Sequence, residues 1–330
     1  MSVLNTTGSI AALTQAEIAT LDGAEIAAAT TAQFVLLTSQ QIGWIVPDAI
    51  SGITSDQLRV MADDEFLALT SNQLPRLSQT QIEALETSDI VALDAEQFRF
   101  LGGLNSPGDG VRYLSSDQVV AMSAADFAAL STVQVEFLAA SAERLRALEN
   151  DDIEALTTDQ LRAIGAQFSV LTTSQIVALE NGDLANLTSA QIRDLTTDQV
   201  AALQTQDIKS LSTTQINYWD TARLQALTTA QIAALDDGDV ASLSNSELQS
   251  LLSDQIRALE TQDLQSLGSS QIQALLTSQL TVLLTDQVRA IDASDFAVFD
   301  ASRIQALTTD AVVALRSDQI QKILDRKSVV

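Results

Sequence analysis

The chain has 330 residues with no cysteine and no histidine, and 43 acidic residues against 17 basic ones give it a formal net charge of −26. Disulfides, thiolate or imidazole catalysis and the usual zinc ligand sets are therefore excluded, and the negative field disfavours nucleic-acid and membrane-surface partners. Because 46% of the residues are hydrophobic, the chain is too apolar for an acidic disordered protein. No apolar run reaches the ~18 residues of a membrane-spanning helix, so we expect a folded chain without membrane insertion.

An eight-residue period runs along the chain. A large apolar residue opens each octad, as at Leu13, at Leu21 and at every eighth position from Leu171 to Leu211, and a second apolar residue stands five positions later. The consensus reads L-T-T-x-Q-I-x-A. A continuous helix cannot carry this pattern, because eight residues at about 100° each overshoot two full turns by about 80°. The apolar stripe would circle such a helix, so each octad is predicted to hold its own short helix.

Each octad also contains the signals of a helix start. In the octad that opens at Leu171, Thr172 suits the N-cap and Gln175 the third helical position, which together form a capping box. Leu171 and Ile176 then occupy the positions of a hydrophobic staple. Helices this short need stacking to be stable, so we predict an all-α superhelical solenoid of very short helices. A β-solenoid with eight-residue rungs is the alternative, because Thr, Ile and Val suit strands, although the abundant Ala, Leu and Gln count against it.

A longer period appears at the fifth position of the octad, which is usually Gln but becomes acidic after alternating gaps of three and four octads. The acidic residues of this series are Glu65, Asp89, Asp126, Asp152, Asp183, Asp207, Asp239, Asp263 and Asp295. The alternation predicts about 3.5 octads, or about 28 residues, per superhelical turn, by the reasoning that relates heptads to supercoils. The acidic residues would then form a ladder along one edge.

Many of these octads are also acidic at their second position. The resulting carboxylate pairs are Glu86 and Asp89, Glu149 and Asp152, Glu180 and Asp183, Asp236 and Asp239, Glu260 and Asp263, and Asp292 and Asp295. We identify them as candidate calcium ligands, because hard cations prefer several oxygen ligands; no other cofactor is expected. An alternative interpretation is that acidic residues mark the most exposed corner of the unit, where a capped helix start faces water.

The octad lattice is interrupted between Leu101 and Leu114 by a segment dense in Gly, with Asn, Ser and Pro. We predict a single array over residues 1–330 with a loop insertion at 102–113. Because loops on repeat scaffolds often carry binding, Asn105 and Asp109 in this loop are candidate interaction residues.

The two ends of the chain differ in charge. Basic residues crowd the C-terminal segment, for which we predict a basic cap at 316–330, whereas no charge precedes Glu17 at the N-terminus. Solenoids need polar caps to prevent end-to-end association. Ile10 and Leu13 are therefore predicted to be the docking residues through which copies of the chain associate end to end.

The ten residues ALTTAQIAAL at 226–235 resemble the Leu-Thr-x-x-Gln-Ile repeat tracts of large secreted or surface-associated bacterial proteins. The resemblance implies a structural, adhesive or filament-forming rod that is extracellular or lies at the cell surface. The first thirty residues contain no basic segment followed by an apolar one, so we expect export by a signal-peptide-independent route. A cytoplasmic location is the alternative.

No Ser, Lys or Asp has an activating partner at an identifiable spacing, so we expect no enzymatic activity. The leading hypothesis is a structural repeat protein whose partners are its own copies or other proteins. An intracellular protein-binding scaffold is the alternative hypothesis, and an acidic mimic of nucleic acid is a remote one.

Overall fold

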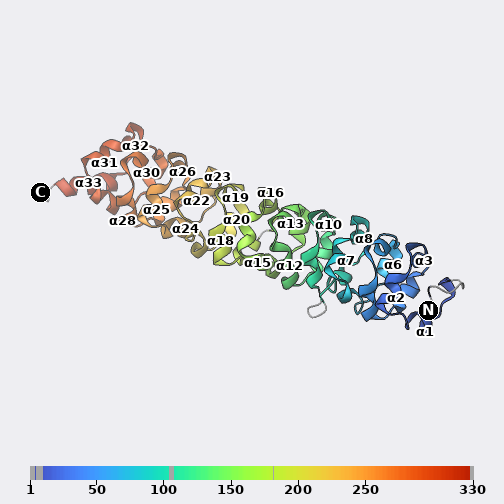
Figure 1. Ribbon diagram of the computed structural model, residues 1–330. Coiled ribbons are helices and arrows are strands. Elements are labelled where there is room, and N and C mark those ends of the chain that lie inside the picture. The colour runs from blue at the N-terminus through green and yellow to red at the C-terminus, as the bar shows by residue number, and fades with distance from the viewer. Residues whose placement is uncertain (1–3, 5–9, 104–107, 181, 328–330) are drawn as a thin grey trace. The chain divides into compact units, whose positions relative to one another are not determined.

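The computed structural model of the chain describes residue 4 and residues 10–103, 108–180 and 182–327. In these residues the secondary structure consists of very short α- and 3₁₀-helices joined by short extended links, with no strand. Figure 1 shows the helices following one another along the chain. The prediction of an all-α array is confirmed, and the β-solenoid alternative is wrong.

The chain divides into two compact units, Met1–Ala178 and Leu179–Val330. The first unit contains η2 (Ile10–Ala12), α1 (Gln15–Ile18), α2 (Gly23–Ala28), α3 (Thr31–Phe34), α4 (Ser39–Trp44), η3 (Pro47–Gly52), α5 (Ser55–Leu58), α6 (Asp63–Leu67), η4 (Leu74–Arg76), α7 (Gln79–Glu83), α8 (Thr87–Ala92), α9 (Ala95–Phe98), η5 (Asp109–Tyr113), α10 (Ser116–Val120), α11 (Ala124–Ala129), α12 (Thr132–Ala139), α13 (Ala142–Ala147), α14 (Asn150–Ala155), α15 (Thr158–Ala163), η6 (Gly165–Val170) and α16 (Thr173–Val177).

The second unit contains α17 (Asp183–Asn186), α18 (Ser189–Asp194), α19 (Thr197–Ala202), α20 (Thr205–Ser210), α21 (Thr213–Ile216), α22 (Thr221–Ala226), α23 (Thr229–Ile232), α24 (Asp237–Ser242), α25 (Asn245–Ser250), α26 (Ser253–Ala258), α27 (Thr261–Ser266), α28 (Ser269–Ala274), α29 (Thr277–Leu280), α30 (Thr285–Ala290), η7 (Ala293–Val298), α31 (Ala301–Ala306), α32 (Thr309–Val313) and α33 (Ser317–Lys327). The single array over 1–330 stays a prediction.

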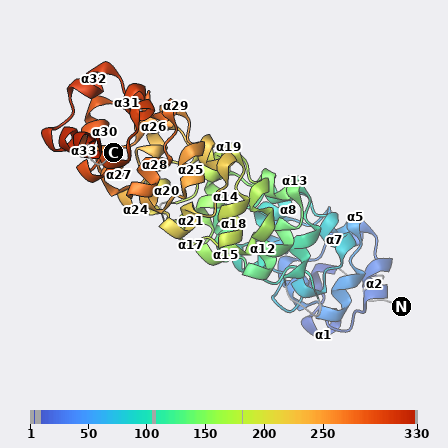
Figure 2. The ribbon, with the colours of Figure 1, turned by 90° about the vertical axis from the view of Figure 1, so that its left-hand side faces the viewer.

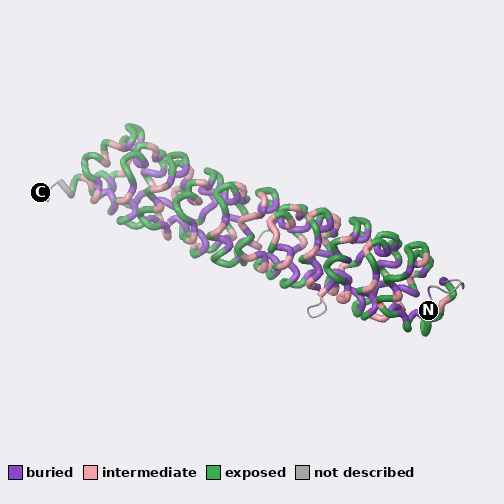
Figure 3. Tube along the Cα trace, viewed as in Figure 1, coloured by how far each residue is buried: buried purple, intermediate pink, exposed green. Residues whose placement is uncertain are grey.

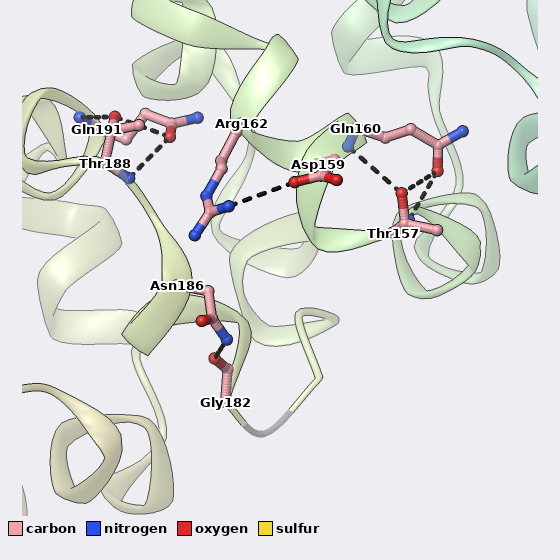
Figure 4. Close-up of polar contacts among 8 residues, drawn as sticks. All are labelled: Thr157, Asp159, Gln160, Arg162, Gly182, Asn186, Thr188 and Gln191. Carbon is pink, nitrogen blue, oxygen red and sulfur yellow. Dashed lines mark hydrogen bonds and ion pairs between the residues drawn. The ribbon is translucent and has the colours of Figure 1, made fainter.

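The predicted capping box is present in most of the α-helices, although α13, α22 and α31 lack it. In α16 the Thr172 hydroxyl oxygen accepts a hydrogen bond from the backbone N–H of Gln175 at 3.2 Å, and the Gln175 side-chain oxygen accepts one from the N–H of Thr172 at 2.8 Å. Figure 4 shows two further copies, Thr157 with Gln160 and Thr188 with Gln191. Two of the N–H groups that a helix start leaves without a partner are thereby satisfied in every such octad.

The core of each unit is a column of side chains from octad positions one and six. At position six, Ile176, Ile208 and Ile256 have no exposed surface, and at position one Leu171 is 3% exposed. Figure 3 shows buried positions recurring along the trace between exposed ones. Burying such a side chain contributes about 1.5–3 kcal/mol, which these helices require because helices of a few residues are unstable in isolation.

Successive turns stack through helices that lie three elements apart in the chain. In the first unit α11 packs on α14, and in the second unit α24 packs on α27 (Figure 2) and α27 on α30. Three elements correspond to about three octads. This spacing agrees with a superhelical turn of 3.5 octads. In such a turn each helix stacks between the helices that lie three and four octads earlier in the chain.

Glycines close the insertion at 102–113. The N–H of Gly102 donates to the carbonyl of Leu74 at 3.0 Å, the N–H of Gly110 donates to that of Leu101 at 2.8 Å, and Gly108 has a φ of 91°, which favours glycine. The segment η5 then returns the chain to the lattice, with Val111 fully buried in the core. Of the predicted interaction residues, Asp109 begins η5 and is half-buried, whereas Asn105 lies outside the described residues.

Candidate functional site

Glutamine at the fifth octad position joins one superhelical turn to the next. The Gln231 side-chain oxygen accepts a hydrogen bond from the N–H of Thr228 at 2.7 Å and so caps α23. Its Nε2 donates to the carbonyls of Val200, 31 residues earlier, and Leu203, 28 residues earlier, at 2.8 and 2.7 Å. Gln231 is only 2% exposed. One buried amide therefore uses its acceptor within its own octad and its donors on the turn below.

The same two bridges recur through both units. The glutamines whose Nε2 donates to the carbonyls 28 and 31 residues earlier include Gln41, Gln57, Gln73, Gln81, Gln97, Gln255, Gln279, Gln287 and Gln319. A separation of 28 residues is 3.5 octads, so the predicted superhelical period is confirmed in each unit. The carbonyls that accept these bonds lie near helix ends, and the carbonyl of Val200 also accepts the N–H of Leu203 at 3.3 Å.

Arginine replaces glutamine as the bridging donor in some octads. Arg303 donates from Nη2 to the carbonyls of Ile272 at 2.7 Å and Leu275 at 3.0 Å, again 31 and 28 residues earlier. Its helix α31 is capped by Asp300, whose carboxylate accepts the N–H of Arg303 at 2.9 Å. An Arg has five donors and no acceptor, so the cap must come from the second position. Sequence reasoning missed this role, although the Asp-x-x-Arg spacing of Asp300 and Arg303 was its signal.

An acidic residue at the fifth position still accepts the N-cap N–H of its own helix, but it has no donor for the carbonyls of the preceding turn. In α27 a carboxylate oxygen of Asp263 accepts the N–H of Glu260 at 2.7 Å, and Asp263 is 1% exposed. The other buried members, Glu65, Asp89, Asp126, Asp152, Asp207, Asp239 and Asp295, are 1–7% exposed, and Asp183 is half-buried. The interpretation that these residues mark the most exposed corner of the unit is therefore wrong, because the short side chain is held against the preceding turn.

Burial changes the protonation of six of these carboxyl groups. It raises the pKa of Asp89, Asp152 and Asp263 to about 6, against a partial opposing effect of the N-cap N–H that donates to each carboxylate. The same cause raises the pKa of Glu65, Asp207 and Asp239. Ionisation of these six carboxyl groups at neutral pH therefore destabilises the contact of each with the preceding turn.

Three-octad steps of the acidic ladder bring its members onto neighbouring helices. Asp126 and Asp152 lie on α11 and α14, which pack together, and Asp239 and Asp263 lie on α24 and α27, which also pack together. This agrees with the predicted ladder within each unit.

The candidate calcium pairs combine an exposed and a buried carboxylate. Glu86, Glu149, Glu180, Asp236, Glu260 and Asp292 are exposed, whereas the fifth-position partners point into the contacts described above. Across the described parts of the chain, no three His, Cys, Asp or Glu side chains are grouped so that they could hold a metal ion. Calcium binding stays a prediction, and the melting temperature in millimolar calcium against matched magnesium tests it: a calcium-specific rise supports binding, and equal temperatures contradict it.

The two predicted docking residues are not fully exposed. Ile10 is 6% exposed and Leu13 is half-buried. At the C-terminal end the position-six residues Val312 and Ile320 are 37% and 42% exposed. Ile320 lies within the predicted C-terminal cap at 316–330, and Val312 precedes it. Docking through Ile10 and Leu13 stays a prediction. In the described residues no helix is long and apolar enough to span a membrane.

A known repeat family matches part of the chain. The ALTTAQ repeat model matches residues 145–181, 176–206, 200–237 and 256–292. No curated protein matches the chain. The matched stretches contain the Leu-Thr-x-x-Gln phrase that the sequence indicated, and the fifth-position Gln of that phrase is the residue that bridges the turns.

Proposed function

We propose that this helical repeat protein has a non-enzymatic, structural role as a spacer. The observation that carries the proposal is the double use of the fifth-position residue, as in Gln231, which caps one helix and binds the turn before it. The fifth-position glutamines thus stabilise the stacking of one turn on the next. A chain built in this way holds whatever is attached to its ends at a separation set by the number of turns.

The test uses deletions that preserve the lattice. Removing 56 residues removes seven octads and, at 3.5 octads per turn, two whole turns. One variant lacks residues 37–92 in the first unit, another lacks residues 211–266 in the second, and both are compared with the full chain for rescue of the phenotype caused by loss of the gene. A spacer loses function equally in both, because only length matters. A chain with a single catalytic or binding site retains function in at least one of the two variants, and that result would contradict the proposal.

We place the spacer outside the cell or at its surface, on the basis of the resemblance of its octads to repeat tracts of secreted and surface-associated proteins. Protease treatment of intact source cells distinguishes the compartments. A surface protein is digested while a cytoplasmic marker survives, whereas a cytoplasmic scaffold is digested only after lysis.

A protein-binding scaffold is the second candidate, favoured by an apolar surface on the first unit. Leu67 is 52% exposed and lines one groove with Trp44 and a second with Phe100. If this surface binds a protein, Leu67→Glu abolishes co-purification of that protein from source cells, and Val133→Glu, at a residue 50% exposed, leaves it unchanged. Equal recovery with both variants would count against the scaffold.

A further inference from the structure

One side chain of the preceding turn acts on several of the buried fifth-position carboxyls, and it stands 26 residues earlier in the chain. Ser269 begins α28, which packs on η7, and its hydroxyl donates to a carboxylate oxygen of Asp295 at 2.5 Å. Thr213 holds the same place relative to Asp239. Burial raises the pKa of Asp239, and the Thr213 hydroxyl opposes that rise. A hydroxyl in this place therefore stabilises the ionised carboxylate; we call such a pair a hydroxyl rung.

Three other rungs have a second carboxylate where these two have a hydroxyl. The pairs, each on two helices that pack together, are Asp63 and Asp89, Asp126 and Asp152, and Asp237 and Asp263. The later residue of each pair is buried, with 6%, 4% and 1% of its surface exposed at Asp89, Asp152 and Asp263. Besides burial, the charge of the earlier carboxylate raises the pKa of the later one. We call these pairs acid-on-acid rungs.

The charged residues around each buried carboxyl are mostly acidic. On α27 and on α24 and α30, which pack against it, they are Glu260, Asp236, Asp237, Asp239, Asp286 and Arg289. On and around α8 they are Glu86, Asp63, Asp64, Glu65 and Asp117, and on and around α14 they are Glu149, Asp151, Glu154 and Asp126. Burial is the main cause of the pKa of about 6 at Asp263, and the N–H of Glu260 opposes it. The charges of Asp237, Glu260 and Asp236 raise that pKa further.

Protonation decides whether an acid-on-acid rung attracts or repels. Because the folded chain raises the pKa of Asp263 to about 6, the contact is fully stable below about pH 4 and loses stability as the pH rises to about 6. The protonated carboxyl has an O–H that can donate to the facing carboxylate. Two ionised carboxylates repel each other in a contact with little water. A hydroxyl rung keeps its donor at either pH.

We propose that the three acid-on-acid rungs are pH-sensitive joints, at which one turn of the array packs closely on the preceding turn in mild acid and separates from it locally near neutral pH. The glutamine bridges of Gln255 and Gln271, in the octads on either side of Asp263, do not titrate. The opening is therefore confined to the joint while the array stays folded. The joints belong to the array itself and do not depend on its proposed role as a spacer.

Hydrogen–deuterium exchange of the full chain, followed by mass spectrometry of its peptides, measures each joint separately. Exchange is compared at pH 5 and pH 7.5 after correction for the intrinsic exchange rates. Because one pKa unit corresponds to a tenfold change in an equilibrium, we expect the amides of α24 and α27 to lose about tenfold in protection at pH 7.5. The amides of α28 and η7, which the hydroxyl rung of Ser269 and Asp295 joins, should change by about threefold or less.

Two substitutions convert one kind of rung into the other. Asp237→Ser places a hydroxyl opposite Asp263, and we expect it to restore protection of α24 and α27 at pH 7.5. Its matched control, Asp254→Ser, removes the same charge from an exposed residue of α26 and is expected to leave that protection unchanged. The converse variant, Ser269→Asp, places a carboxylate opposite Asp295 and should create a loss of protection at pH 7.5 in α28 and η7.

Circular dichroism at both pH values establishes that each variant is folded. A loss of pH dependence with Asp237→Ser, together with its gain with Ser269→Asp, supports the joints. A loss of protection spread evenly over the second unit at pH 7.5 would overturn the proposal, because it would indicate general repulsion within an acidic chain. Pronounced pH dependence in folded Asp237→Ser, as large as in the wild type, would overturn it as well.

Discussion

Replacing Gln231 with Glu changes a single heavy atom of the bridge, Nε2 to a carboxylate oxygen, and tests what the fifth position contributes. The carboxylate can still accept the N–H of Thr228, but it loses the donors to the carbonyls of Val200 and Leu203, which lie 2.8 and 2.7 Å from Nε2. Two lost hydrogen bonds cost about 0.5–1.5 kcal/mol each. A buried charge facing carbonyl oxygens costs more, and removing one partner of a buried charged contact typically costs ~3–5 kcal/mol. We therefore expect a loss of about 3–5 kcal/mol at pH 7.5.

The assay is denaturant unfolding followed by circular dichroism, with Gln273→Glu as the control. Gln273 is exposed in α28, so the same change of charge there should cost under about 0.5 kcal/mol. Near pH 4.5 the buried carboxyl that replaces the Gln231 amide becomes protonated, its hydroxyl can donate to one carbonyl, and the gap between the variants should narrow. Equal unfolding midpoints for the two variants at pH 7.5 would refute the reasoning.

Two further substitutions test the acidic ladder and the close approach of two turns. Asp263→Asn keeps the acceptor for the N–H of Glu260. Because burial raises the pKa of Asp263 to about 6, the wild-type protein loses the stability of the protonated form as the pH rises from about 4 to about 6. The variant should therefore be about 2 kcal/mol more stable than the wild type at pH 7.5 and equally stable near pH 4. A stability difference that does not change with pH would contradict this, and unfolding at both pH values measures it. Gly52→Ala should cost at least about 3 kcal/mol, because a Cβ on Gly52 would lie 2.1 Å from the carbonyl oxygen of Gly23. Gly268→Ala, whose Cβ would have nothing nearer than 3.7 Å, is the thermal-melting control; equal melting temperatures would show that the turns can separate.

The parts of the fold that depend on local spacing could be predicted from the sequence. The capping box needs only Thr172 and Gln175 three residues apart, and the octad follows from apolar residues such as Leu171 and Ile176. The superhelical period was also readable, because an acidic residue at the fifth position repeats with the turn. All of these signals are linear spacings, which a single sequence contains in full.

What the sequence did not indicate was the direction in which the fifth position points. A Gln at the third position of a helix reads as a surface cap, and an Asp there reads as more exposed still, yet Gln231 and Asp263 are 2% and 1% exposed. Their burial comes from the preceding turn, about 28 residues away, and no local propensity records that contact.

The turn of 3.5 octads is tested most directly by distances between spin labels in solution. The chain contains no cysteine, so cysteines introduced at exposed fourth positions carry the labels without background. One pair joins Asp254 in α26 to Ser278 in α29, three octads later, and the other joins Asp254 to Ser270 in α28, two octads later. Because α26 packs against α29 and two octads turn the chain to the opposite side, we predict a shorter distance for Asp254–Ser278 than for Asp254–Ser270, despite the longer separation in sequence. Distances that increase with sequence separation would contradict the bridged superhelix.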